Sequence, residues 1–437
     1  MKDVFTVNID KLAFGGSGVG RMDGKVCFVP FSCPGDELQV QVVAEKRSYL
    51  TARILEVLTP SLDRTEPRCP LFGACGGCGW QHIKYPEQLA AKKQMLAETM
   101  WRGVRVPDEL VAATVASPLP FGYRNRAQFK LHYAAGRLHI GFYRHGSHFV
   151  EDTAQGCPVV LPVINDALQA FRRVLATFPE PAAIPQINID AAEHGTVAVV
   201  NYIGRDPGRA AAFFAGHADA LTPLTGLYLQ TGRKSTMIKV WGDGLLAYFL
   251  AGSGDGTLPC KLYFPPGGFS QVNILQNRAI LELIRKLADF KGHERLLDLY
   301  CGNGNFSLPV AGEVAEVIGV EEYKESIAAA VDNSRRNGIN NARFTVSDAA
   351  AAVCQFAASG ESFDVVMLDP PRSGAAETVR KLHRLKPSRI IYISCDPSTL
   401  ARDCAILLAN GYHVRSCIPV DMFPQTFHVE SITMFQQ

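Results

Sequence analysis

The sequence predicts an α/β fold for the carboxyl-terminal part of the chain and a small all-β unit at the amino-terminal end. From about residue 261, strand-like and helix-like segments alternate, which is typical of a doubly wound parallel sheet covered by helices. Residues 1–60 hold short strands separated by turns, and three cysteines gather within residues 69–78. We therefore expect three domains: a β domain over 1–60, a central α+β domain over 61–260 and an α/β domain over 261–437.

The composition is that of an ordinary globular protein of 437 residues, 47% hydrophobic and 20% charged. Its 44 basic and 42 acidic residues leave a net charge of +2, so a nucleic-acid surface would have to be local. The chain opens without a basic-then-apolar signal, and it contains no apolar run of membrane-spanning length. We expect a cytoplasmic location, where twelve cysteines indicate metal binding or catalysis rather than disulfides.

The β domain is expected to be a small barrel of the oligonucleotide-binding type. Strand patterns cover residues 4–9, 26–29, 38–43 and 51–57, with turn residues between them. The glycine-rich stretch 15–20 lies between strands and no helix follows it. That context favours a tight turn over a phosphate-binding loop. Acidic and basic residues balance here, so charge does not assign an RNA-binding role to this domain.

The cysteine run predicts a metal centre. Cys69, Cys75 and Cys78 have five and then two residues between them, and glycines in the run let the backbone fold around one point. A fourth ligand is needed, and Cys157, followed by a proline, is the best candidate. Four thiolates suit zinc or an iron–sulfur cluster. The paired short loops of zinc sites are missing, which favours the cluster, although the spacing leaves zinc open.

Two features of the central domain follow the cysteine run. Residues 85–103 read as an amphipathic linking helix, a candidate to pack on the α/β domain. Between residues 121 and 150 the charge is purely basic and aromatic residues interleave with it. Such a pattern suits phosphates and unpaired bases, although a β element with core aromatics would read the same way. The candidate RNA-binding residues here are Arg124, Arg126, Lys130, Arg137 and Arg144.

The α/β domain carries a glycine turn after its first strand. Residues 295–299 read as a strand, and the following Tyr300-Cys301-Gly302-Asn303-Gly304-Asn305 reads as a turn into a helix. A dinucleotide fingerprint would require a third glycine where Ser307 stands. Acidic residues follow the next three strands, at Glu321, Asp348 and Asp369, the last of them within Asp-Pro-Pro-Arg. A carboxylate at position 321 can accept both hydroxyls of a ribose.

The fifth strand of this domain ends at a single cysteine. Residues 390–394 are β-branched, aromatic or small, Cys395 follows, and Asp396-Pro397-Ser398 has the residues that start a helix. The carboxyl end of a parallel strand is where open α/β sheets bind ligands. A helix N-terminus should also lower the pKa of the thiol and make it a better nucleophile. Taken alone, the residue fits an inert buried thiol better than a nucleophile, because free cysteines are often simply buried, and the rest of the chain reverses that preference.

The ordered set of strand-end motifs resembles the class I, Rossmann-like fold of S-adenosylmethionine-dependent methyltransferases, with a terminal hairpin over residues 414–435. Asp-Pro-Pro-Arg at 369–372, Ser-Cys-Asp-Pro at 394–397 and His-Val-Glu at 428–430 together resemble the bacterial RNA (uracil-C5)-methyltransferases. The cysteine run with Cys157 is similar to the iron–sulfur branch that acts on 23S ribosomal RNA. The barrel of that branch is a TRAM domain, which residues 1–60 fit.

The resemblance implies a function and a set of site residues. The enzyme would methylate C5 of a specific 23S rRNA uridine, with Cys395 as the nucleophile that adds to C6 and Glu430 as the base that removes the C5 proton. A [4Fe–4S] cluster would be held by Cys69, Cys75, Cys78 and Cys157. S-adenosylmethionine would contact Gln271, Tyr300, Asn305, Glu321, Asp348 and Asp369. Arg372 and Gln271 would stabilise the enolate oxygen, Arg372 would contact RNA, and the family habit is a monomer without a protein partner or membrane contact.

Several alternatives differ in their sequence requirements. A cytosine-C5 methyltransferase would carry a second cysteine after a proline of the Asp-Pro-Pro motif, and none stands there. An exocyclic-amine methyltransferase would carry an aromatic residue at the place of Arg372. A tRNA uridine is a further candidate substrate, although the tRNA-modifying relatives lack the cluster and the barrel. A non-catalytic RNA-binding or redox-sensing protein would not need Cys395. Neither the identity of the uridine nor the role of the cluster follows from the sequence.

Overall fold

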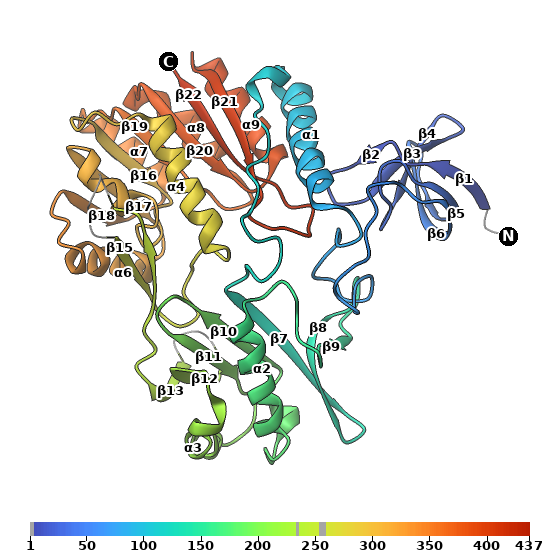
Figure 1. The fold of residues 1–437 in the computed structure, drawn as a ribbon. Coiled ribbons are helices and arrows are strands. Elements are labelled where there is room, and N and C mark those ends of the chain that lie inside the picture. Colours follow the sequence, from blue (N-terminus) through green and yellow to red (C-terminus); the bar gives the residue numbers. More distant parts are fainter. Residues whose placement is uncertain (1–3, 233–235, 253–258) are drawn as a thin grey trace.

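The computed structural model describes residues 4–232, 236–252 and 259–437 and builds them around three large sheets. The amino-terminal barrel lies to one side, the carboxyl-terminal sheet lies at the top, and the central sheet extends below both (Figure 1). None of the helices in the described residues has the length and apolar character that a membrane crossing requires.

The barrel is a six-stranded curled sheet in the order β1-β5-β6-β4-β3-β2. Its two edge strands, β1 and β2, are separated by only two residues in the sequence, and the second of these, Asp10, donates its backbone N–H to the Val19 carbonyl of β3 at 2.8 Å. Val7, Val29 and Val40 are buried in its core. Its strands are β1 (Val4–Asn8), β2 (Lys11–Leu12), β3 (Gly18–Met22), β4 (Lys25–Val29), β5 (Glu37–Glu45) and β6 (Tyr49–Thr59).

The turn predicted over residues 15–20 is partly wrong, because β3 begins inside it. Gly15 and Gly16 have positive φ and form the turn, whereas Gly18 and Gly20 belong to the strand. A Cβ on Gly18 would lie 2.0 Å from the Ser32 hydroxyl, and one on Gly20 would lie 2.4 Å from a backbone carbonyl of β1. These two glycines therefore serve close packing inside the barrel.

A long helix connects the barrel to the carboxyl-terminal sheet. α1 (Tyr85–Val104) runs beside α9 (Pro397–Ala409) and places its apolar face in the same core cluster (Figure 1). The helices approach so closely that a Cβ on Gly103 would lie 2.8 Å from the Ala401 side chain. Although α1 belongs to the central segment of the sequence, it therefore packs on the α/β domain.

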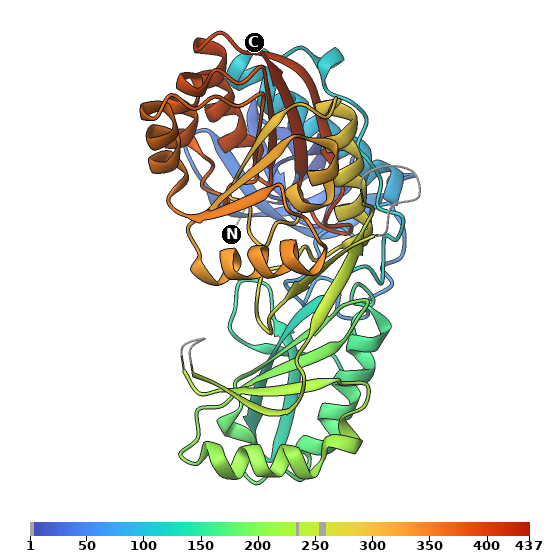
Figure 2. The same cartoon turned by 90° about the vertical axis from the view of Figure 1, so that its left-hand side faces the viewer.

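The central sheet has seven strands in the order β13-β12-β11-β10-β7-β8-β9. The apolar face of α2 covers it through Ile164, Phe171 and their neighbours, and α3 lies at its far end (Figure 2). The elements are η1 (Asp108–Leu110), β7 (Arg126–Ala134), β8 (Arg137–Tyr143), β9 (Val150–Asp152), α2 (Pro162–Leu175), η2 (Pro181–Ala183), β10 (Gln186–Ala191), β11 (Thr196–Asn201), α3 (Pro207–Gly216), η3 (Ala218–Leu221), β12 (Gly226–Gln230) and β13 (Met237–Gly242).

The carboxyl-terminal sheet has the order β18-β17-β16-β19-β20-β22-β21. Its first five strands are parallel, and β22 and β21 form the antiparallel hairpin that was predicted. The predicted doubly wound fold is therefore confirmed. The elements are β14 (Leu246–Leu250), β15 (Cys260–Phe264), α4 (Ile274–Ala288), β16 (Arg295–Leu299), α5 (Ser307–Val310), η5 (Ala311–Glu313), β17 (Glu316–Glu321), α6 (Lys324–Arg336), β18 (Ala342–Val346), α7 (Ala349–Ala358), β19 (Val365–Leu368), α8 (Ala376–Leu382), η6 (His383–Leu385), β20 (Arg389–Ser394), β21 (His413–Val420) and β22 (Glu430–Gln436).

Candidate active site

The strand-end residues of the carboxyl-terminal sheet meet at one edge, because the carboxyl ends of parallel strands point the same way. From β16 the chain continues to β17 and β18 on one side of the sheet, and then returns to place β19 and β20 on the other side. The point between β16 and β19 where this direction changes lies between the glycine turn, which follows β16, and Asp369, which follows β19. Tyr300 occupies a left-handed conformation with φ 66°, and its hydroxyl pairs with the Thr378 hydroxyl at 2.8 Å. The glycine turn is thereby held to α8 across the opening of the sheet.

Two carboxylates predicted to contact the cofactor are oriented by backbone amides. Glu321 accepts hydrogen bonds from the backbone N–H of Gly302 at 3.3 Å and of Tyr323 at 2.9 Å. Asp348 caps α7 by accepting from the Ala351 N–H at 2.8 Å. Backbone N–H groups near the strand ends therefore orient both carboxylates, and Glu321 lies directly beside the glycine turn.

Asn305 and Gln271 differ in what their side chains can offer. The buried amide of Asn305 pairs reciprocally with that of Asn277, at 2.8 and 2.9 Å, and its oxygen also accepts from the Tyr248 hydroxyl at 2.7 Å. Its side chain is therefore committed to fixing the turn, and a cofactor contact would come from its backbone. Gln271 is half-buried, and its carbonyl accepts from the Asn125 side chain at 3.0 Å, which joins the central sheet to this site.

Two buried aspartates at this edge have pKa values raised to about 7. For Asp369 the causes are burial and then the charge of Glu321. For Asp298, which the sequence analysis missed, burial is the main cause and the charges of Asp369 and Glu321 add to it. A carboxylate in the middle of a buried strand was the available signal. The site therefore gathers more negative charge than the strand-end motifs alone indicate.

Cys395 lies partly exposed at the end of β20, as predicted. Asp396 caps α9 by accepting from the backbone N–H groups of Ser398 and Thr399 at 2.8 and 3.0 Å. The predicted lowering of the thiol pKa is wrong, because burial and the charge of Glu430 raise it to about 11. The charge of Arg372 acts in the opposite direction. Burial thus determines the net direction of the pKa shift, and the neighbouring carboxylates add to it.

The register of the hairpin brings Cys395 and Glu430 together. In the antiparallel pairing of β20 with β22, Ser394 lies opposite Ser431, so Cys395 and Glu430 are the next residues along the two strands. Glu430 is only 8% exposed. Burial and the charge of Asp369 raise its pKa well above the ordinary value, against the opposing charge of Arg372. The predicted nucleophile and the predicted base therefore share one buried, charged environment.

His428 adds a neutral imidazole to this environment. Burial, followed by the charges of Arg372, Lys92 and Arg124, lowers its pKa to about 4. Its ring lies 4.5 Å from that of Phe427, which in turn meets Phe14 of the barrel edge-on at 6.2 Å. In the sequence, His428 was noted only as part of the His-Val-Glu motif. Its position two residues before Glu430 was the available signal that it would share the surroundings of that residue.

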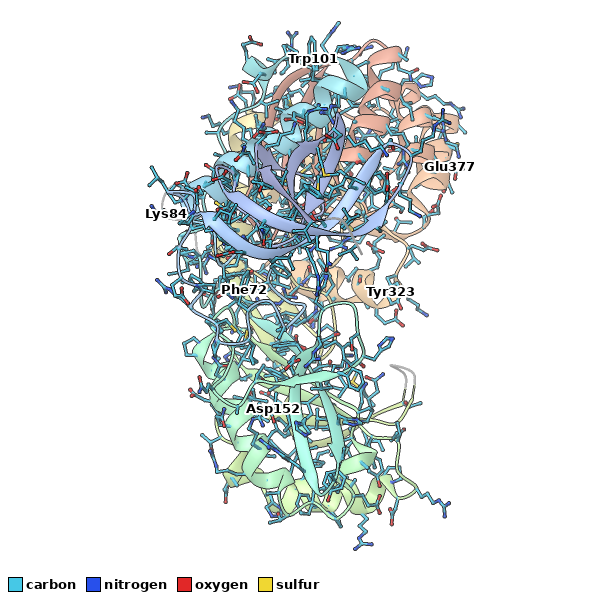
Figure 3. The ribbon with its side chains drawn as sticks, turned by 90° about the vertical axis from the view of Figure 1, so that its right-hand side faces the viewer. Phe72, Lys84, Trp101, Asp152, Tyr323 and Glu377 are labelled. Atoms are coloured by element: carbon cyan, nitrogen blue, oxygen red, sulfur yellow. The ribbon has the colours of Figure 1, made fainter. Side chains whose placement is uncertain are left out.

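The four predicted cluster cysteines line one cavity of about 500 Å³ below the barrel. Phe72, from the loop between the first two cysteines, also lines it and lies between the barrel and the central sheet (Figure 3). Gln81 accepts from the Cys69 backbone N–H at 3.0 Å, and Gly77 donates to the Cys75 sulfur at 3.4 Å. As placed, no group of three or more histidine, cysteine or acidic side chains among the described residues could hold a metal ion.

The cysteine thiols in this cavity raise one another's pKa values. Burial is the main cause, raising the pKa of Cys78 to about 12 and that of Cys157 to about 11, and the charges of the other cysteines add to it. The pKa of Cys75 is raised for the same reasons. A cation that displaced the thiol protons would remove this mutual repulsion, so the donor set fits a thiolate-bound metal centre once the cavity contracts around it.

The predicted RNA-binding residues are mostly engaged within the protein. Arg124 and Arg126 line the cysteine cavity, and Arg126 also pairs with Asp190 and donates to the Gly268 carbonyl. Arg144 pairs with Glu151 at 2.5 Å, and Lys130 donates to the side chain of Gln186. Arg137 is exposed at the start of β8. The charge of Arg372 lowers the pKa values of Cys395 and Glu430, so this residue belongs to the surroundings of these two side chains.

Comparison with known proteins agrees with this geometry. Residues 261–437 match the family model described as tRNA (Uracil-5-)-methyltransferase, and residues 3–55 match the TRAM domain model. The chain is 36% identical to the 23S rRNA (uracil(1939)-C(5))-methyltransferase RlmD of Thiobacillus denitrificans, over 99% of each chain. It is 35% identical to the RlmD of Pectobacterium atrosepticum, over 98% of this chain and 93% of that one.

A solved structure shares the whole fold. The tRNA (uracil-54, C5)-methyltransferase of Pyrococcus abyssi, solved in complex with S-adenosyl-L-homocysteine, superposes with a TM-score of 0.74 at 24% identity. The match covers 98% of this chain and 99% of that one. At this identity the likeness concerns the fold alone. Because the match covers almost all of this chain, the barrel included, the expectation that tRNA-modifying relatives lack the barrel is wrong for this relative.

Proposed function

Because the chain belongs to the family of RNA uracil-5-methyltransferases, we propose that it transfers a methyl group from S-adenosylmethionine to C5 of a uridine in 23S rRNA. The observation that carries the proposal is the pairing of Cys395 and Glu430 across neighbouring strands at the cofactor edge of the sheet. Methylation of a tRNA uridine is the second candidate, because the Pyrococcus abyssi protein of the same fold is described as acting on tRNA.

The first step assigned to this chain is activation of the pyrimidine. C5 of uracil is too electron-poor to attack a methyl sulfonium, so Cys395 adds to C6 through its thiolate. The new C–S bond converts the C5–C6 double bond into an enolate, and C5 becomes nucleophilic. Arg372, whose charge favours the thiolate, also lies near enough to stabilise the negative charge of the enolate oxygen.

The second task of the chain is to resolve the adduct. When bound, S-adenosylmethionine would supply an electrophilic methyl group, and C5 would form the new C–C bond while the S–CH3 bond breaks and the neutral thioether leaves. Glu430 then takes the C5 proton, the C5–C6 double bond re-forms, and the C–S bond breaks to release the Cys395 thiolate. A buried carboxylate with a raised pKa is well matched to this proton transfer.

The cofactor is assigned to the edge formed by β16, β17 and β18. Tyr300 and Glu321 flank the glycine turn, and Asp348 and Asp369 end the adjacent strands. Gln271 lies on the loop before α4, and its backbone carbonyl accepts a hydrogen bond from the Asn125 side chain. We assign these side chains, and the backbone of Asn305, to cofactor binding. The target base must leave its stack to reach Cys395, which requires flipping or a single-stranded loop.

We assign a [4Fe–4S] cluster to Cys69, Cys75, Cys78 and Cys157, which line the cavity below the barrel. When bound, such a cluster would supply a cross-link between the cysteine run and the segment before α2. The four thiols would bind it as thiolates. Arg124 and Arg126, which line the same cavity, are suited to balance the resulting negative charge. We assign the cluster a structural role, because Cys395 lies on a different sheet.

The reaction is tested by the fate of Cys395. Wild-type protein with S-adenosylmethionine and 23S rRNA fragments should produce 5-methyluridine, and a Cys395→Ser variant should produce none. In a denaturing gel, Cys395→Ser should also form no covalent adduct with unmodified RNA, whereas Cys404→Ser should behave as wild type. Cys404 is the matched control because it is buried on the adjacent α9, away from the strand end. Methylation by Cys395→Ser would refute the mechanism.

The cluster is tested by colour and metal content. Protein purified without oxygen should be brown, absorb in the visible blue and contain iron, and Cys157→Ala should lose all three properties. Colourless protein with stoichiometric zinc would overturn the cluster assignment without affecting the assignment of Cys395.

A further inference from the structure

The loop that ends at Glu430 is held by parts of the chain outside the α/β domain. Residues 421–429, here named the bridging loop, connect β21 to β22, and Glu430 is the first residue after it. Gln425 lies near its middle in a left-handed conformation, with φ 67°. A non-glycine residue adopts this conformation only where its surroundings favour it. The contacts of Gln425 therefore indicate what holds the loop.

Gln425 is paired with Gln88 of α1, 337 positions away in the sequence. The Gln88 side-chain amide donates to the Gln425 side-chain oxygen at 3.1 Å, and the Gln425 backbone N–H donates back to the Gln88 oxygen at 3.0 Å. Gln88 is fully buried and also donates to the carbonyls of Trp80 and Ile83 at 3.1 and 2.9 Å. Every polar atom of this side chain is therefore engaged in joining the loop to the cysteine-run segment.

The backbone of the cysteine-run segment holds the same residue from the other side. The N–H groups of Gly79 and Trp80, directly after Cys78, both donate to the Gln425 carbonyl, at 3.1 and 3.0 Å. The Tyr123 hydroxyl donates to the adjacent Pro424 carbonyl at 3.0 Å. The middle of the bridging loop is thus bound by groups from both sides of the cysteine cavity.

A buried ion pair anchors the beginning of the loop. Lys92 of α1 pairs with Asp421 at 2.5 Å with both side chains fully buried, and it also donates to the Phe423 carbonyl at 3.1 Å. The Tyr85 hydroxyl donates to the second Asp421 oxygen at 2.7 Å. A buried pair of this kind is stable only where further hydrogen bonds satisfy both partners, as they do here. α1 therefore holds the loop at two points.

We propose that the Gln88–Gln425 amide pair positions Glu430 for removal of the C5 proton, so that these two glutamines are positioning residues for resolution of the adduct. The inference rests on the proposed function. Within the part of the chain that the structure describes, the side chains of Gln88 and Gln425 form no hydrogen bond with Tyr300, Glu321 or Cys395, so loss of the pair leaves cofactor binding and addition at C6 in place. Loss of the pair changes the path by which the bridging loop enters β22, whose first residue is Glu430. Misplacement of a catalytic group by about 1 Å can lower a rate about 100-fold.

Two variants weaken the pair in different ways: Gln425→Gly removes only the bond to the Gln425 side-chain oxygen, and Gln88→Met removes both bonds. Gln425→Gly deletes the side chain while keeping the backbone N–H, the carbonyl and the positive φ, which glycine adopts freely. Gln88→Met keeps the length of the side chain but removes its polar atoms. Gln94→Ala is the matched control, because Gln94 lies on the same helix, is exposed and bonds only Glu98, at 3.0 Å.

We expect Gln425→Gly to lower kcat about 10- to 100-fold, with KM for RNA and Kd for S-adenosylmethionine changed less than about twofold. During turnover, methylated RNA should accumulate as a covalent adduct on a denaturing gel, as it should with Glu430→Gln. Gln88→Met should show the same split, and Gln94→Ala should match wild type. A thermal melt identifies any variant that fails to fold. If Gln88→Met does not fold, Gln425→Gly carries the test alone.

Folded Gln425→Gly with wild-type kcat, or with reduced kcat but no methylated adduct, would overturn the positioning role. A merely structural role would lower cofactor affinity and kcat together, without adduct accumulation. Failure of the proposed function would be recognised separately, since wild-type protein itself would then form no 5-methyluridine and no adduct.

Discussion

Two regions of the chain place partly buried thiols in different surroundings. In the cavity below the barrel, Cys75, Cys78 and Cys157 have pKa values raised by burial and then largely by the charges of neighbouring cysteines. At the end of β20, the pKa of Cys395 is raised by burial and by the charge of Glu430. The first region holds a set of neighbouring thiols, and the second holds a single thiol beside a carboxylate and an arginine.

The difference shows that the charged groups beside a thiol determine its chemistry. Thiols that repel one another are stabilised together by a cation, which removes all their protons at once. A single thiol beside a carboxylate gives up its proton only when a reaction is available, and the carboxylate can then act as a base. We therefore expect metal content to depend on the cysteines of the cavity and turnover to depend on Cys395. A substitution at one of these sites should have little effect on the property that depends on the other.

The largest effect is expected from cysteine substitutions that test the two sites one at a time. Cys395→Ala should lower kcat by on the order of 10⁴-fold or more, because a covalent step is lost, while its iron content stays unchanged. Cys78→Ala should abolish iron binding and lower kcat only to the extent that the protein unfolds. Metal analysis and single-turnover methylation would check both variants. Loss of iron in Cys395→Ala would contradict the separation.

Removal of the metal centre should lower stability more than it lowers cofactor affinity. The centre would link residues 69–78 to Cys157, and metal binding of this kind contributes directly to the free energy of folding, by several kcal/mol. Oxidative bleaching or chelation should therefore lower the melting temperature, while S-adenosylmethionine still binds at the glycine turn. Calorimetric titration of bleached protein would measure this affinity. Complete loss of cofactor binding in still-folded protein would show that the two regions are coupled.

The pH dependence of adduct formation should report the surroundings of Cys395. Because burial and Glu430 raise its pKa to about 11, the thiolate fraction and the adduct rate should rise about tenfold per pH unit between pH 6 and 9. Arg372→Gln removes a charge that lowers the pKa and should slow adduct formation. Quench-flow followed by denaturing gels would measure these rates, and a pH-independent rate would contradict them.

The smallest expected effects concern the basic residues of the central domain. Exposed Arg137, if it contacts a phosphate, should change the salt slope of RNA affinity by about 0.9 when replaced by glutamine. Arg126→Gln should change the slope little, because its charge is already paired with Asp190. Arg124→Gln should alter the metal centre rather than the slope, because Arg124 lines the cysteine cavity. Filter binding at several salt concentrations would distinguish the three variants.

Local patterns were sufficient where a residue's role depends on its own strand. The doubly wound parallel sheet was predicted from the alternation of strands and helices, the terminal hairpin was predicted from the family resemblance, and Cys395 lies at the strand end where it was expected. The prediction failed where glycines served packing, as at Gly18 and Gly20 in β3. It also missed Asp298, whose role depends on charges from two other strands.

By itself the sequence determined the order of elements, the spacing of the cysteine run and the placement of Cys395 before a helix, because these depend on residues close together in the chain. Only the tertiary structure decided the direction of the Cys395 pKa shift, the pairing of Cys395 with Glu430 and the attachment of the bridging loop to Gln88. These depend on groups distant in the sequence, whose charges and hydrogen bonds act only over a few ångströms and so require the folded chain.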